Sequence, residues 1–215
     1  MGKLCRDKPK TETEWKQARF NRGIGGSEAA AIVGASTWMT ANDLWQIKTG
    51  NKMPKDISDD PFVQQGHRME GALRELYKSY HPDYRVRYHK YDLLYRAENP
   101  WLFCTLDGEV IDADGRNGIF EAKTNTPIGK AGWAKWDCRI PDAYMIQILH
   151  QLLATGWEFA DLMACLINQD GDFTVRTYHF ERSDYEEDLA WLLEKEQAFW
   201  RSVQNKTLPP MTLII

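Results

Sequence analysis

Gly118-Ile119-Phe120-Glu121-Ala122-Lys123 is the stretch of sequence that decides the fold of this chain. Its apolar start is typical of a buried strand. Because side chains two positions apart share one face of a strand, Glu121 and Lys123 point to the same side. Turn-forming residues precede the stretch at 114–117. We therefore predict a hairpin that pairs it with residues 106–111 and brings Asp107 close to Glu121.

Helices and strands alternate on both sides of this hairpin. Apolar spacing and turn residues predict the following elements: helices over 62–80, 144–155 and 183–204, and strands over 161–168 and 173–180. Glu70 lies at the edge of the apolar face of the first helix, and Gln147 lies off the apolar stripe of the second. This order predicts an α/β fold with a central mixed β-sheet flanked by helices.

The N-terminal part of the chain is expected to be helical around a glycine-rich turn. That turn is Arg22-Gly23-Ile24-Gly25-Gly26, and residues 13–20 before it predict a helix. Ser27 is expected to be the N-cap of a short helix over 28–33. Thr40 with Asp43 resembles a capping box that begins another helix, and residues 51–61 predict a surface loop.

Composition restricts the class of protein. The 215 residues suit one domain with a real core, and no apolar run approaches the roughly 20 residues that span a bilayer. The four cysteines are scattered, which predicts a reduced intracellular compartment and argues against a zinc or iron–sulfur site. The net charge of −4 does not suit a broad basic DNA-coating face. Residues 1–23 are nevertheless basic, with seven Lys or Arg against three acids, and residues 181–196 are acidic.

Asp107, Glu121 and Lys123 form the set that predicts chemistry, with Glu70 upstream. Phosphodiester hydrolysis uses a hard divalent cation, and such cations take oxygen ligands. We expect Asp107 and Glu121 to hold Mg²⁺ with the backbone carbonyl of Ala122, and Lys123 to orient the attacking water or stabilise the transition state. Glu70 is expected to hold a second metal ion directly or through water.

The short (D/E)xK pattern is weak when taken alone. Glu14-Trp15-Lys16 also matches it and lies in a predicted helix. For Glu121 and Lys123, the alternative is a charge pattern on a solvated face. The upstream Asp107, the buried strand and the glutamine-bearing helix that follows favour the catalytic interpretation.

Several motifs in order resemble the YqaJ viral recombinase family, which includes lambda exonuclease and has a PD-(D/E)xK nuclease core of the restriction-endonuclease-like type. The matching segments are Gly23–Ile32, Leu44–Gly50, Gly66–Glu70, Leu106–Gly108, Phe120–Lys123, and Tyr144–Gly156 with Gln147. Two positions depart from the family pattern. Leu106 stands where proline often precedes the metal aspartate. Leu149 stands where a second glutamine often lies, so that role is lost or taken over by His150 or Gln151.

The resemblance implies a function. It implies a 5′→3′ exonuclease that digests one strand of linear double-stranded DNA with two Mg²⁺ ions, for which Mn²⁺ can substitute. It further implies a ring-shaped homotrimer, a single-strand annealing protein as partner, and a phage or prophage recombination role in the bacterial cytoplasm. An endonuclease on the same fold and an inactive DNA-end-binding subunit stay open as alternatives.

A pocket for the 5′-phosphate is expected in the N-terminal part. Gly25 and Gly26 allow an anion to approach the backbone, and Ser27 begins a helix. Arg19 or Arg22 supplies the fixed charge, and the sequence does not rank the two. Thr105 adds a hydroxyl next to the metal site. The alternative is an ordinary capped helix after a tight turn.

We therefore expect a single nuclease domain over residues 1–215. Residues 1–61 are its helical portion that binds the DNA end and phosphate, 62–180 the catalytic core, and 181–215 the C-terminal helix and tail. Trp133 and Trp136, in a segment that looks like a loop, are expected either to stack on frayed DNA or to pack in the core or against another subunit.

Overall fold

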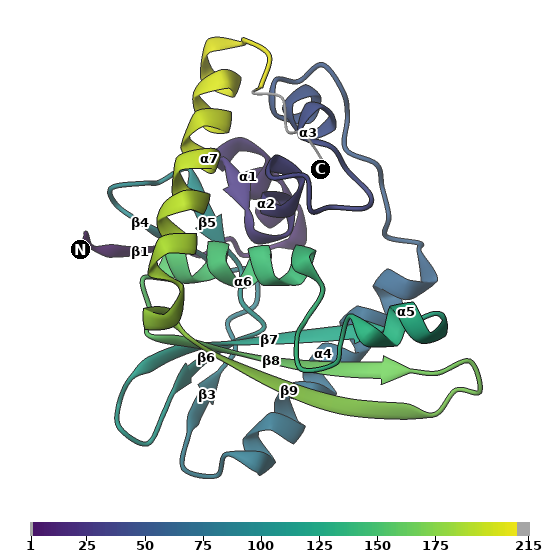
Figure 1. Ribbon diagram of the computed structural model, residues 1–215. Helices are drawn as coiled ribbons and strands as arrows, with labels where there is room; N and C mark the ends of the chain where they lie inside the picture. The colour runs from purple at the N-terminus through teal and green to yellow at the C-terminus, as the bar shows by residue number, and fades with distance from the viewer. Residues whose placement is uncertain (1, 210–215) are drawn as a thin grey trace.

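A five-stranded mixed sheet forms the centre of the molecule (Figure 1). The structure, a computed structural model, describes residues 2–209, so the end of the predicted C-terminal tail lies outside the described residues. In spatial order the strands are β3 (Arg85–Arg87), β6 (Gly108–Ile111), β7 (Asn117–Asn125), β8 (Phe159–Ile167) and β9 (Phe173–Glu181). β7 and β8 are parallel and the other pairs are antiparallel. The predicted hairpin is therefore confirmed as β6 and β7, and the strands predicted over 161–168 and 173–180 are confirmed as β8 and β9.

Two helices cover the two faces of this sheet. α6 (Asp142–Thr155) packs on one face and α4 (Pro61–Tyr80) on the other (Figure 1). The side chains of β7 alternate between the two faces of the sheet, so this strand contributes to the core on each face. Ile119 enters the core under α6, whereas Phe120 enters the core against α4. Glu121, next along the strand, consequently faces the α6 side.

A second sheet of four short strands lies beside the first, and the sequence did not predict it. Its strands, in order, are β1 (Leu4–Asp7), β4 (Leu93–Arg96), β5 (Leu102–Cys104) and β2 (Ile24–Gly25). β2 lies inside the stretch that we interpreted as a simple glycine turn. Pairing with β5 makes it a strand, and strands this short carry little periodic signal. The pairs β1–β4 and β2–β5 join the N-terminal portion to the catalytic core.

Three helices make up most of residues 1–61. They are α1 (Glu12–Arg22), α2 (Gly26–Ile32) and α3 (Ala41–Lys48). The capping box of Thr40 and Asp43 is confirmed. The prediction for Ser27 is wrong, because Gly25 is the N-cap of α2 and Ser27 lies inside the helix. Glu28 causes this earlier start, since its side chain accepts a hydrogen bond of 2.8 Å from the backbone N–H of Gly25.

Gly23 connects α1 to β2 at a point of close backbone contact. The backbone N–H of Ile24 donates to the carbonyl of Trp101 over 2.8 Å. A Cβ atom at position 23 would lie 2.0 Å from that same carbonyl oxygen. Only glycine therefore allows α1 to approach β5 in this way. α1 itself has no fully buried side chain.

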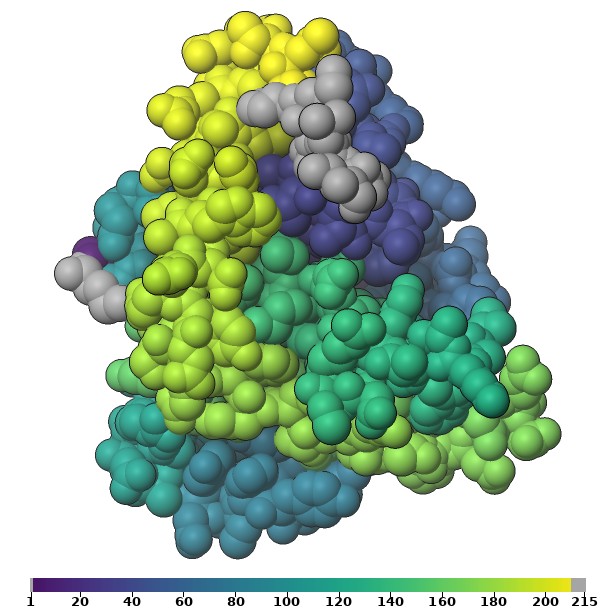
Figure 2. Space-filling view, viewed as in Figure 1, coloured from purple at the N-terminus to yellow at the C-terminus, as the bar shows by residue number. Residues whose placement is uncertain are grey.

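The C-terminal helix α7 (Glu186–Asn205) follows a short 3-10 turn, η1 (Arg182–Tyr185), and runs along the outside of the molecule (Figure 1; Figure 2). Its acidic side chains at 186, 187, 188 and 194 are exposed, as expected for a solvated acidic face. Glu196 is the exception, because it is fully buried against His150. Within residues 2–209 no helix combines the length and apolarity needed to cross a membrane.

The segment between β7 and α6 is more ordered than a loop. Residues Gly129–Ala134 form the short helix α5, which includes Trp133. Trp136 is 1% exposed and belongs to the main core, with its ring beside that of Tyr144. Core packing is therefore the outcome for Trp136, and stacking on frayed DNA is ruled out for it in this arrangement.

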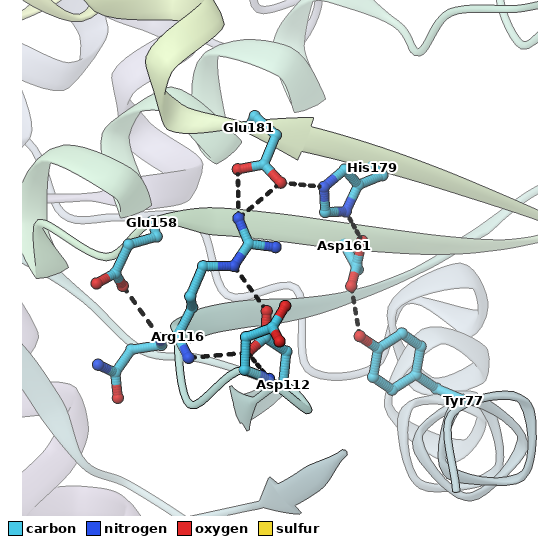
Figure 3. Close-up of polar contacts among 9 residues, drawn as sticks. Tyr77, Asp112, Arg116, Glu158, Asp161, His179 and Glu181 are labelled. Carbon is cyan, nitrogen blue, oxygen red and sulfur yellow. Dashed lines mark hydrogen bonds and ion pairs between the residues drawn. The ribbon is translucent and has the colours of Figure 1, made fainter. Parts of the chain in front are cut away.

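A chain of polar side chains fastens α4 to the sheet (Figure 3). Buried Tyr77 of α4 donates a hydrogen bond to Asp161 of β8, and Asp161 also contacts His179 of β9 at 2.6 Å. Burial and then the charge of Asp161 raise the pKa of Tyr77, so it stays a donor. Burial acts to lower the pKa of His179, but hydrogen bonds to Glu181 and Asp161 outweigh it and raise that pKa. Two turns before Tyr77, the same helix carries Glu70.

Candidate active site

A cavity of about 520 Å³ opens beside the C-terminal half of β7. It is lined by residues from α1, α2, α4, β7 and α6 and from the segments at 88–91 and 105–107. These residues are Glu12, Trp15, Arg19, Gly26, Ser27, His67, Glu70, Tyr88, His89, Lys90, Tyr91, Thr105, Leu106, Asp107, Glu121, Lys123, Gln147 and Gln151. The lining thus includes the carboxylates of Glu70, Asp107 and Glu121 with Lys123, and also Arg19 with the hydroxyls of Ser27 and Thr105.

Glu121 is held at the bottom of the cavity by three donors. The side chain is 3% exposed, on the central strand of the sheet. Its Oε1 accepts from Lys123 Nζ and from Gln147 Nε2, each over 2.6 Å. Its Oε2 accepts from Gln151 Nε2 over 2.7 Å. The two neighbours on α6 and the one on β7 thus fix the plane of the carboxylate.

Lys123 stays protonated in this setting. Burial acts to lower its pKa, but the charges of Glu121 and Asp107 outweigh burial and raise it. Its Nζ also donates to Gln147 Oε1 over 3.1 Å and lies 5.1 Å from the ring centre of Tyr144. The lysine is therefore a fixed positive charge beside the carboxylates.

Asp107 is positioned by two hydrogen bonds, one to its side chain and one to its backbone carbonyl. Its Oδ2 accepts from the backbone N–H of Ala122 over 2.9 Å, and its own carbonyl accepts from Arg74 over 2.6 Å. Burial, followed by the charges of Glu121 and Glu70, raises the pKa of Asp107 well above its usual range. Burial likewise raises the pKa of Glu70. Negative charge is therefore costly here unless a cation joins it.

The donor set fits a hard divalent cation. Carboxylate oxygens crowded in one buried cavity are the ligands that Mg²⁺ prefers. Among residues 2–209 no three His, Cys, Asp or Glu side chains are close enough to form a ready cage. Mg²⁺ commonly takes only one or two carboxylates and fills its remaining positions with water and phosphate oxygens, so Asp107 and Glu121 suffice in number.

Arg19 of α1 also lines the cavity. This half-buried side chain lies over the ring of Trp15, at 4.5 Å, and its Nη1 donates to Thr105 Oγ1 over 3.4 Å. Burial lowers the pKa of Arg19, although a guanidinium remains charged at neutral pH. Ser27 lines the same cavity and is exposed.

Arg22, the other candidate for the phosphate, lies elsewhere. It forms an ion pair with Asp7 of β1, donates to the carbonyl of Pro100 over 3.3 Å, and packs 4.0 Å from the ring centre of Tyr95. It does not line the cavity within the described part of the chain. The structure therefore separates the two arginines that the sequence left unranked.

The structure brings together all the other predicted side chains: Asp107, Glu121, Lys123, Glu70, Gln147, Arg19, Ser27 and Thr105. Ala122 contributes its backbone N–H to Asp107. Sequence reasoning missed Arg74 and left Gln151 only as an alternative. Both lie four residues after a predicted site residue, Glu70 and Gln147 respectively, and that helical spacing was the available signal.

The central mixed sheet between α4 and α6, with the carboxylates and lysine beside β7, has the restriction-endonuclease-like fold. The family within this class follows from sequence comparison. The chain belongs to the YqaJ-like viral recombinase domain family, whose sequence profile matches residues 14–158.

Relatives of this chain include the protein YqaJ of Bacillus subtilis (strain 168), which is 27% identical over 197 residues. That match covers 92% of this chain, and the chain spans 58% of the length of that relative. Among solved structures, an alkaline exonuclease from Laribacter hongkongensis is similar, with a TM-score of 0.66, 18% identity, and coverage of 90% of this chain and 93% of that one. A phage-related exonuclease from Haemophilus somnus 129PT has a TM-score of 0.53 at 11% identity, with coverage of 86% and 96%.

Proposed function

We propose that this chain is a metal-dependent deoxyribonuclease that digests one strand of linear duplex DNA in the 5′→3′ direction. One observation carries the proposal. Asp107, Glu121 and Lys123 line the same cavity of about 520 Å³ as Arg19, so a carboxylate–lysine site and a fixed positive charge share one space. That arrangement suits a DNA strand that ends there, with its 5′-phosphate on Arg19 and its first phosphodiester at the carboxylates.

In this proposal Asp107, Glu121 and the Ala122 carbonyl hold Mg²⁺, and Glu70 serves a second ion. Mn²⁺ is expected to substitute. The bound ions supply Lewis acidity at the scissile phosphate and activate water. Lys123 orients that water and offsets the charge that builds on the phosphate. Gln147 keeps Lys123 and Glu121 in register, because it hydrogen-bonds both.

The family supports a wider role. We propose that the chain assembles into a ring-shaped homotrimer around DNA and prepares ends for a single-strand annealing protein in phage-type homologous recombination, in the cytoplasm of a bacterial host. A closed ring would gather the basic N-terminal segments around the DNA and leave the acidic face of α7 outside. Such an arrangement reconciles duplex binding with a net charge of −4.

One assay tests the proposed reaction. The purified protein is given linear duplex, closed-circular duplex and Mg²⁺, with and without chelator. We expect mononucleotides from linear DNA only, and none once the metal is chelated. Cleaved circles would instead identify an endonuclease. DNA-end binding with no hydrolysis would identify an inactive end-binding subunit.

The grip of Arg19 on the 5′-phosphate gives a separate prediction. Duplex ends with a 5′-phosphate should be digested about 10- to 100-fold faster than 5′-hydroxyl ends, the range expected for charge-assisted hydrogen bonds. Arg19→Ala should remove most of this ratio. Arg22→Ala should keep it, because Arg22 pairs with Asp7. Digestion rates on the two kinds of end measure it, and equal rates for the unmodified protein would rule out the pocket.

A further inference from the structure

Gln151 is the buried residue of α6 that the proposed chemistry has not used. It lies four residues, about one helical turn, after Gln147 and is 0% exposed. Its Nε2 donates to Glu121 Oε2 over 2.7 Å. It also lines the cavity. Gln151 and Gln147 thus approach the same carboxylate from one face of the helix, each at a different oxygen.

Leu149 and His150, which lie between these glutamines in the sequence, cannot take this position. Leu149 points into the apolar core and is 3% exposed. A step of two residues turns about 200° around a helix, which places Leu149 away from Gln147. His150 uses both ring nitrogens elsewhere, with Glu196 Oε1 at 2.8 Å and the Phe103 carbonyl at 2.8 Å.

The acceptor positions of the Glu121 carboxylate explain what the second amide does. Each carboxylate oxygen offers about two acceptor positions. Oε1 already accepts from Lys123 and Gln147, whereas Oε2 accepts from Gln151. Without Gln151 the carboxylate would be held at one oxygen and free to turn about that end. With Gln151 bound, Oε2 is also held in place, and its one remaining acceptor position points in a fixed direction.

The other end of the Gln151 amide is unsatisfied. Its Oε1 is buried and has no hydrogen-bond partner. Buried polar atoms in native proteins nearly always have a partner, often an ordered water. This oxygen keeps almost no surface that a water can reach, so the Nε2 end of the amide is the end that serves Glu121.

We propose that Gln151 is a positioning residue of the active site: its Nε2 fixes Oε2 of Glu121 for a divalent cation. The glutamine pair of this chain is therefore at positions i and i+4, and Leu149 is a core residue. The proposal rests on the proposed function for its kinetic consequence, but not for its metal-binding consequence.

The first test compares Mn²⁺ binding by electron paramagnetic resonance titration in the full-length protein. Gln151→Met, a change of similar size without the amide, should lower Mn²⁺ affinity about 10-fold or more, the typical cost of losing an outer-shell partner of a metal ligand. The rate at saturating DNA should fall about 10- to 100-fold, with KM for DNA ends unchanged. Adding Leu149→Gln to this variant should not restore either quantity.

A matched control tests whether any change in the buried side of α6 would lower Mn²⁺ affinity in the same way. Leu152→Met changes a buried side chain of the same helix at nearly constant volume, away from Glu121, and should leave Mn²⁺ affinity within twofold. Equal losses in Leu152→Met and Gln151→Met would overturn the proposal, as would wild-type Mn²⁺ affinity in Gln151→Met or rescue by Leu149→Gln. A parent protein that binds Mn²⁺ without cutting DNA would overturn the proposed function, and Mn²⁺ affinity would still decide the role of Gln151.

A second measurement uses only the unmodified protein, so it does not depend on whether a variant folds. Side-chain amide signals of the unmodified protein are followed by NMR during Mg²⁺ and then Mn²⁺ addition. The NH₂ signals of Gln151 and Gln147 should shift with Mg²⁺ and broaden with Mn²⁺. Those of Gln64, whose Nε2 donates to the Ser58 carbonyl over 3.1 Å at the surface, should do neither. A Gln151 signal as unresponsive as that of Gln64 would overturn the proposal.

Discussion

Lys123→Ala should nearly abolish DNA hydrolysis, with a loss of about 10²- to 10³-fold, while DNA binding and folding persist. The variant removes a fixed charge that contacts Glu121 at 2.6 Å and that no neighbouring cation replaces within the described site. Loss of one electrostatic group aimed at the transition state costs about 10²- to 10³-fold in well-studied hydrolases. Asp107→Ala should be equally severe, because it removes a proposed metal ligand. Mononucleotide release from linear duplex in Mg²⁺ measures both.

The chain supplies its own control for this result. Lys16 belongs to the other (D/E)xK tripeptide but lies exposed on α1, paired with Glu12 at 2.7 Å. Lys16→Ala should therefore keep hydrolysis close to the wild-type rate. Substantial hydrolysis by Asp107→Ala, or an equal loss in Lys16→Ala, would contradict the site assignment.

Gly23→Ala should have the largest effect on folding stability. The added Cβ would meet the Trp101 carbonyl oxygen at 2.0 Å, and that oxygen is backbone and already accepts from Ile24. Relief requires moving α1 away from β5. We expect a loss of about 3 kcal/mol, the upper range for overpacking, and a fall in Tm of roughly 6 to 12 °C for a domain of this size. Thermal unfolding measures it.

Because Arg19 lies on α1, the same variant should also lose most of the preference for 5′-phosphate ends at temperatures where it is still folded. Gly66→Ala is the matched control. Gly66 lies inside α4, and a Cβ atom there would meet nothing within 4 Å. That change should raise stability by about 1 kcal/mol through helix propensity. A Gly23→Ala protein as stable as Gly66→Ala would show that α1 and β5 are not held at this point.

Most of the catalytic half could be predicted from the sequence because its signals are local. The hairpin that carries Asp107 and Glu121, and the helix that carries Gln147, each have their own periodicity and turn residues. The second sheet could not be predicted, because β2 is two residues long and exists only through its pairing with β5. The start of α2 was misplaced for a similar reason, since the side chain of Glu28 reaches back to Gly25.

The choice between Arg19 and Arg22 shows a different limit of prediction from the sequence. Both lie on α1, and no local rule separates them. Asp7, on a strand that the sequence did not predict, pairs with Arg22 and leaves Arg19 at the cavity. Gln151 was similarly hidden, because its role depends on which face of α6 meets β7. The roles of such residues are decided by contacts with residues that are distant in the sequence.

The absence of fully buried side chains in α1 has a consequence for motion. Segments with little buried surface open locally at low free-energy cost, whereas a central strand opens only when its neighbours separate. β7 lies between β6 and β8, so Glu121 and Lys123 belong to the most slowly opening part of the sheet. We expect Arg19, on α1, to belong to a part that opens at lower free-energy cost. Under the proposed function, we therefore expect the part of the cavity that carries Arg19 to yield to an entering or leaving strand end while Glu121 and Lys123 keep their positions.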